Sequence, residues 1–179
     1  MPSGKLSSAV SIALLATATV FIASCDGAKT TDPMAGHNHA IVAPSFVKYD
    51  SPLANQVKGG LAKFHSQVQA SKAGYALASP CIANPAAGGM GFHWVNGSLV
   101  DPVFDPMNPE AVLYDTSGKL VAVEYIVIDI GQPAPTFGGE PFNIGGTPVP
   151  VPHWSLHVWL YEPNSNGLFN PWNPAVVCP

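Results

Sequence analysis

Hydrophobic and polar residues alternate most regularly in residues 152–161, which read PHWSLHVWLY. Side chains of a β-strand point to opposite faces of the sheet with a period of two. One face of this segment is therefore apolar, whereas the other carries the imidazoles of His153 and His157 among aromatic rings. The pattern predicts a strand at the centre of a sheet, with the core on one side and a candidate site on the other.

A helical period marks the region that begins at Ser51. Its apolar residues fall three or four positions apart and so trace one face of an α-helix; they are Leu53, Val57, Leu61, Phe64 and Val68. Ser51 is suited to cap the amino-terminal end, and Gly74 supplies a residue that can adopt the left-handed conformation at the end of a helix. The pattern predicts one long helix between these two residues.

Further strands are predicted between the helix and residues 152–161. Residues 90–95 alternate between two faces, and residues 111–114 and 119–129 flank the turn sequence DTSG, which is typical of a hairpin. Prolines and glycines fill most of the connections. The sequence therefore predicts an α+β fold, in which one long amphipathic helix packs on an antiparallel sheet of four to five strands with Pro/Gly-rich loops. A small β-sandwich is the alternative.

Composition adds information about the partners of this domain. The chain has 179 residues, of which 47% are hydrophobic and 10% are charged, and its net charge is −4. All seven basic residues are lysines. Because arginine is the usual bidentate partner of phosphate, and because a negative chain repels a polyanion, we expect no nucleic-acid partner.

The amino terminus has the pattern of an export signal. Lys5 precedes an apolar run over residues 9–23, which is too short to span a bilayer comfortably. The sequence IASC that ends at Cys25 resembles the lipobox of bacterial lipoproteins. The resemblance implies that residues 1–24 are a lipoprotein signal peptide and that Cys25 carries acyl chains, such as palmitate, after cleavage. We expect an exported protein, anchored by lipid at the bacterial cell membrane or in the periplasm; an ordinary signal peptide is the alternative.

Two segments follow the signal peptide. Residues 25–47 are small and polar without an apolar period, which predicts a flexible tether. His37 and His39 lie in this tether and are interpreted as solvated, because a mobile segment makes a poor preformed metal site. Residues 48–179 are predicted to form a single globular domain.

The domain contains two further cysteines, Cys81 and Cys178. An exported chain meets an oxidising compartment, so we expect these two residues to form a disulfide once Cys25 is lipidated. The bridge would close a loop of about a hundred residues and tie the chain's end to the region after the helix. Two free thiols are the alternative.

Glu124 is the most informative single residue, because its predicted strand is otherwise rich in apolar side chains. A carboxylate in such surroundings is costly to bury unless it is paired or bound to a cation. His93 and His157 lie centrally in their own predicted strands. If the polar faces of neighbouring strands coincide, two imidazoles and one carboxylate converge, a ligand set familiar for Zn²⁺ and also suited to iron or copper. The alternative is a structural network of hydrogen bonds among these residues.

Two other histidines are weaker candidate ligands. His153 lies four residues before His157, about 13 Å along an extended strand, so the two can barely reach one ion. His65 lies at the edge of the apolar stripe of the predicted helix, and it approaches the site only if the helix covers the face that carries the site. The sequence has no HExxH, CxxC or P-loop motif that would indicate a particular reaction.

Residues 88–96, 109–127 and 152–178 resemble a group of exported bacterial proteins of uncharacterised activity. The shared features are M-G-x-H, V-E-Y and L-H-x-W segments and a terminal N-P-x-V-x-C. The resemblance spans roughly Leu53 to Cys178 and implies that these segments belong to one domain.

We therefore expect a lipid-anchored protein of the bacterial envelope that binds a metal ion or small ligand through its His/Glu cluster. A metal-dependent hydrolase or oxidoreductase that uses the same cluster is one alternative. A structural envelope protein without a site is the other.

Overall fold

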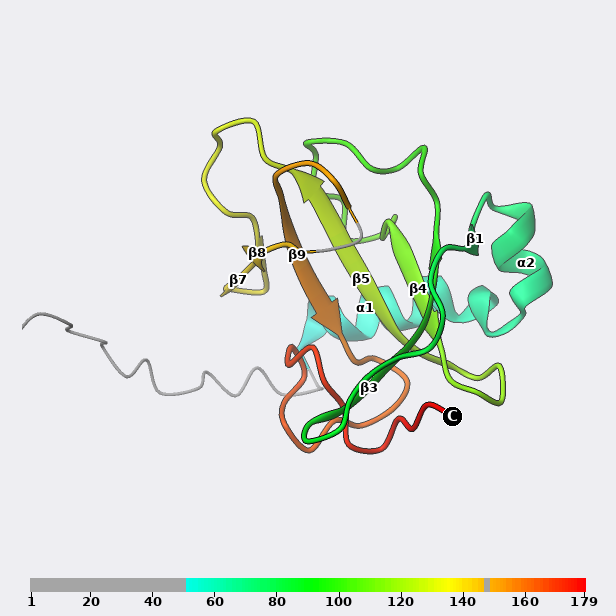
Figure 1. The fold of residues 1–179 in the computed structure, drawn as a ribbon. Helices are drawn as coiled ribbons and strands as arrows, with labels where there is room; N and C mark the ends of the chain where they lie inside the picture. The colour runs from blue at the N-terminus through cyan, green and yellow to red at the C-terminus, as the bar shows by residue number, and fades with distance from the viewer. Residues whose placement is uncertain (1–50, 147–148) are drawn as a thin grey trace, which may run out of the picture. The chain divides into compact units, whose positions relative to one another are not determined.

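Figure 1 shows the computed structural model, which describes residues 51–146 and 149–179. The predicted signal peptide, tether and lipidated Cys25 lie outside these residues. Within them, helices and a large antiparallel sheet form the predicted α+β class. None of the helices in the described part is long and apolar enough to cross a bilayer.

The main sheet has seven strands: β1 (Ala76–Leu77), β2 (Ile82–Asn84), β3 (Gly88–Val95), β4 (Ala111–Tyr114), β5 (Leu120–Ile128), β8 (Asn143–Ile144) and β9 (His153–Val158). Their order is β1-β3-β4-β5-β9-β8, and β2 also pairs with β3. A separate hairpin joins β6 (Thr136–Phe137) to β7 (Glu140–Pro141). The prediction of four to five strands was too low because β1, β2 and β8 have only two or three residues each, too few for an alternating pattern.

The prediction of one long helix is wrong. Its start is as expected: α1 (Pro52–Leu61) is capped by Ser51, whose side chain accepts a hydrogen bond from the backbone N–H of Ala54 at 3.0 Å. A short 3₁₀ helix, η1 (Ala62–His65), then replaces the α-helical geometry. The helix that follows, α2 (Gln67–Lys72), has only six residues.

Ser66 separates η1 from α2. Its backbone is extended, and its hydroxyl accepts a hydrogen bond from the backbone N–H of Gln69, so it acts as the cap of a new helix. Serine favours such caps because its side chain competes for backbone hydrogen bonds. The break also changes the buried face: Val68, which the apolar stripe placed in the core, is 63% exposed, and Ala70 is buried instead.

Helix α1 runs behind the central strands β4, β5 and β9, whereas α2 lies to the side near β1 (Figure 1). Two tyrosine hydroxyls join the layers: Tyr114 donates to the backbone oxygen of Phe64 at 2.6 Å, and Tyr161 donates to that of Lys58 at 2.8 Å. The central strands β4 and β5 are almost entirely buried. An apolar core therefore lies between the helices and the sheet. The opposite face of β5 carries the polar side chain of Glu124.

The predicted disulfide between Cys81 and Cys178 is confirmed, with Cα atoms 5.6 Å apart across a sequence separation of 97 residues. The carboxy-terminal segment also lies against β3, since Gly89 and Asn173 exchange two backbone hydrogen bonds of 3.0 Å. A side chain at Gly89 would place its Cβ 2.6 Å from the backbone oxygen of Val176, so this close approach requires glycine. The carboxy-terminal segment thus packs against β3, the strand that carries His93.

Glu110 is a second buried carboxylate, 1% exposed, and it lies just before β4. Its side chain accepts a hydrogen bond from the backbone N–H of Ile126 at 2.8 Å. Burial is the main cause that raises the pKa of Glu110 from 4.5 to about 8, against the effect of this hydrogen bond. Between pH 4.5 and about 8, the folded protein therefore keeps a proton on Glu110 that the unfolded chain releases.

This proton makes stability depend on pH. The contribution of Glu110 to stability is complete below pH 4.5 and is lost as pH rises from 4.5 to about 8, a change of a few kcal/mol at about 1.4 kcal/mol per pKa unit. Glu110→Gln keeps an acceptor for Ile126 and is expected to remove this part of the slope. Urea denaturation near both limits of the window measures it, and an identical slope in the variant and the parent would contradict the assignment.

Candidate metal centre

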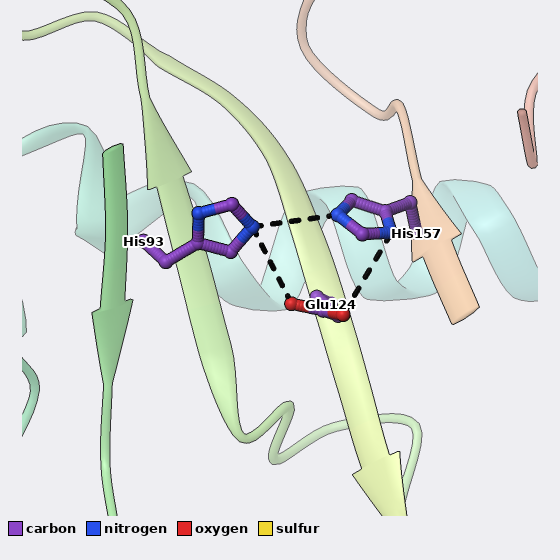
Figure 2. A group of neighbouring side chains, drawn as sticks. All are labelled: His93, Glu124 and His157. Carbon is purple, nitrogen blue, oxygen red and sulfur yellow. Dashed lines mark hydrogen bonds and ion pairs between the residues drawn. The ribbon is translucent and has the colours of Figure 1, made fainter. Parts of the chain in front are cut away.

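Strands β3, β5 and β9 bring His93, Glu124 and His157 together. Glu124 and His157 are directly opposite in the ladder between β5 and β9, and such pairs share a face. His93 pairs with Leu113 on the intervening β4, and Leu113 pairs with Ala122, two residues from Glu124, so His93 projects from the same face. Figure 2 shows the three side chains pointing toward one another across the sheet.

The intervening strand β4 leaves room for this contact. In the row of Glu124 it carries Ala111, which is fully buried and offers only a methyl group. Neighbouring strands are about 4.8 Å apart, so His93 and Glu124 must reach across roughly two strand spacings. The row of His93 carries Leu113, so the contact between His93 and Glu124 crosses β4 diagonally between Leu113 and the smaller Ala111.

The distances within the group are too long for good hydrogen bonds. Nε2 of His93 lies 3.5 Å from Oε2 of Glu124 and 3.5 Å from Nε2 of His157, and Nδ1 of His157 lies 3.8 Å from Oε1 of Glu124. Well-formed N–H···O bonds measure about 2.7–3.2 Å. Two ligands bound tetrahedrally at about 2.0–2.1 Å from one zinc ion lie about 3.3 Å apart. The two 3.5 Å contacts of His93 Nε2 therefore suit ligands around a shared ion, whereas the 3.8 Å contact comes from the other nitrogen of His157.

The ligand atoms form a compact set: one atom from each residue can be chosen so that all lie within 4.8 Å of one another. The side chains of His93 and Glu124 are each 13% exposed, and that of His157 is 7% exposed.

Burial sets the charge state of the group. It lowers the pKa of His157 to about 4, and it lowers the pKa of His93 despite the opposing effect of Glu124. Burial also raises the pKa of Glu124, although His93 and His153 oppose this shift. Near neutral pH the two imidazoles therefore carry no charge, and each retains a lone pair. A bound cation would then provide the positive charge that pairs with the carboxylate of Glu124.

Ser79 contacts both the ring and the backbone of His93. Its hydroxyl oxygen lies 3.1 Å from Nδ1 of His93, accepts a hydrogen bond from the backbone N–H of His93 at 3.2 Å and lies 2.8 Å from the backbone oxygen of Pro80. When the hydroxyl proton goes to Pro80, Nδ1 donates to Ser79 and Nε2 keeps a lone pair directed at Glu124 and His157. Sequence reasoning missed Ser79, because no spacing or pattern distinguishes one loop serine from another.

The two weaker candidates lie outside this group. His153 pairs with Ile128 near the other end of β9, and its Nδ1 lies 2.8 Å from the backbone oxygen of Val151. His65 is exposed in η1, and its ring contacts that of Tyr161 with centroids 4.7 Å apart. The group of residues that could hold an ion does not include His65.

The group opens into a cavity of about 560 Å³, and all three candidate ligands line it. This volume falls within the range of about 300–1,000 Å³ that is usual for small-molecule sites. An ion held by the three residues would therefore have an open coordination position toward a space large enough for a ligand.

No protein-family model, no curated protein and no solved structure matches this chain. The resemblance to exported bacterial proteins consequently stays a prediction, and the functional conclusion depends on the geometry of the site.

Proposed function

We propose that this protein binds a divalent transition-metal ion through His93, Glu124 and His157. The observation that carries the proposal is the spacing of the ligand atoms, 3.5 Å for two of the contacts, around a cluster whose imidazoles are neutral. Two nitrogen donors and one carboxylate favour Zn²⁺ first, with iron and copper as alternatives, over the oxygen sites that Mg²⁺ and Ca²⁺ prefer.

The proposed place of action is the bacterial envelope, where the protein is exported and anchored through acylated Cys25. The lipobox-like sequence before Cys25 supports the anchor. The disulfide between Cys81 and Cys178 supports an oxidising compartment, because such bridges are rare in reducing ones. A tether that holds the domain near the membrane fits a protein that captures its ligand from the surrounding medium.

A second candidate function is metal-dependent hydrolysis or oxidoreduction at the same cluster. The observation that favours it is the cavity of about 560 Å³ at the open side of the ligands, where a metal-bound water or substrate would be accommodated. Glu124 would then serve as a ligand. Metal-dependent turnover of a small ester such as p-nitrophenyl acetate, absent in His157→Ala, separates an enzyme from a binding protein.

Metal analysis of the full chain, purified without a histidine tag, tests the proposal. We expect one equivalent of zinc per chain and a loss of affinity of at least about 100-fold in His157→Ala, because removing one of three protein ligands leaves an incomplete site. His65→Ala is the matched control: it removes an exposed imidazole that is not among the candidate ligands and should keep the full equivalent.

A second control removes the tether histidines, since His37→Ala with His39→Ala should also leave the equivalent unchanged. Less than stoichiometric metal in the parent chain, together with thermal unfolding that a chelator does not change, would contradict the proposal. That result would favour a structural envelope protein whose histidines only pack.

A further inference from the structure

The cavity beside the metal centre has a mainly apolar wall outside its three candidate ligands. Strands β2, β3, β5 and β8 and the carboxy-terminal segment contribute side chains to it, among them Ile82, Met90, Val95, Ile126, Ile144 and Phe169. An apolar surface of this kind gains free energy when hydrocarbon replaces water against it. The wall therefore favours a ligand with an apolar body.

The charges of the cavity limit the head group of that ligand. Among the described residues that line it, Glu124 alone carries a formal charge, and no lysine is present. A divalent ion held by one carboxylate and two neutral imidazoles has a net charge of about one positive unit. A head group with a single negative charge neutralises the centre, whereas a dianion would leave one charge unpaired in an apolar space.

Three residues of β9 line the cavity. His157, Ser155 and His153 lie at alternate positions of this strand and all line the cavity, so they share one face. A rise of about 3.3 Å per residue places the first and last of them about 13 Å apart. This length admits an extended hydrocarbon chain whose head lies at His157.

We propose that the cavity binds a small monoanionic organic ligand of the medium-chain monocarboxylate class. Its carboxylate takes the open position on the metal ion, and its hydrocarbon chain lies against the apolar wall formed by the other strands and the carboxy-terminal segment. This inference rests on the proposed metal site and names the class of molecule that the site receives.

Titration of the cobalt-loaded full chain with acetate, butanoate, hexanoate and octanoate tests the inference. The visible absorption of bound Co²⁺ reports entry of a carboxylate into its coordination sphere. We expect affinity to rise about fourfold for each methylene added between butanoate and octanoate, because each one leaves water for an apolar wall. Calorimetry on the metal-free chain is expected to give at least about tenfold weaker octanoate binding, since the head group then lacks its ligand bond.

Two matched variants locate the chain of the ligand. Val95→Thr changes the polarity of the wall at nearly constant shape and is expected to weaken octanoate about fivefold while leaving acetate unchanged. Val103→Thr makes the same change at a residue that is 64% exposed and is not among the lining residues; it should alter neither affinity.

The outcomes separate the two levels of the proposal. Stoichiometric cobalt with an affinity that does not depend on chain length would overturn the ligand class and leave the metal site intact. Equal octanoate affinity with and without cobalt would overturn coordination of the head group. If cobalt itself fails to bind stoichiometrically, both the metal site and the inference built on it are wrong.

Discussion

Glu124→Gln is expected to raise the free energy of unfolding of the metal-free protein by about 1–2 kcal/mol and to abolish its stabilisation by zinc. The carboxylate of Glu124 is only 13% exposed, and its nearest imidazole nitrogens lie 3.5 and 3.8 Å away, beyond good hydrogen-bond distance. Folding therefore removes the charged group from water without replacing the interactions it loses. Glutamine has nearly the same shape and no charge to desolvate.

The sign of this effect distinguishes a metal site from a structural network. If Glu124 were the satisfied centre of a hydrogen-bond network, its replacement would leave buried partners unpaired and lower stability by about 1–3 kcal/mol. Urea denaturation of the metal-free chain near pH 8, with and without zinc, measures both quantities. Zinc at about a thousand times its dissociation constant should stabilise the parent chain by about 4 kcal/mol and the variant by much less.

Glu162→Gln provides the matched control for this experiment. Glu162 forms an ion pair with Lys119 at the surface and is not among the candidate ligands. Surface pairs contribute about 0–1 kcal/mol, so this variant should lose little stability and keep its full response to zinc. A stabilising effect of the same size in both variants would show that the gain at Glu124 comes from net charge and not from the site.

Reduction of the disulfide between Cys81 and Cys178 is expected to lower the free energy of unfolding by about 4–5 kcal/mol. The bridge closes a loop with a sequence separation of 97 residues, and loss of a loop of this length frees many conformations of the unfolded chain. The carboxy-terminal segment would then be held mainly by its contacts with β3, such as the backbone hydrogen bonds between Gly89 and Asn173.

Urea denaturation with and without reductant measures this effect. The double variant Cys81→Ser/Cys178→Ser should have the stability of the reduced parent and should not respond to reductant. Reduction is also expected to weaken zinc binding, because Ser79, which orients His93, lies only two residues before Cys81. Equal stability of the oxidised and reduced parent would contradict the role assigned to the bridge.

Much of the site was predictable because the alternation of a strand is a local property. The period of two placed Glu124 on the face of β5 that also carries Ala122 and Ile126, and the structure pairs it directly with His157. The cost of burying a carboxylate among apolar residues then identified Glu124 as a candidate ligand. The spacing of about 13 Å between His153 and His157 along a strand ranked His157 above His153, and the group that could hold an ion contains only the former.

The helix shows where a local pattern fails. The apolar stripe continues through Val68, but Ser66 caps a new helix, α2, whose buried face is different. Val68 is exposed as a result. The free energies of continuing a helix and of capping a new one differ by about 1 kcal/mol, and tertiary packing easily reverses a difference of this size.

By itself, the sequence determined the class of the fold, the two faces of the long strands, the cysteine pair and the three side chains that could bind a metal. Only the tertiary structure decided that β4 lies between β3 and β5, that His93 reaches Glu124 across β4, and that helix lies behind the face opposite the ligand group. The physical reason is one of range. Side-chain direction along a strand follows from backbone geometry within a few residues, whereas the order of strands follows from contacts between segments far apart in the chain.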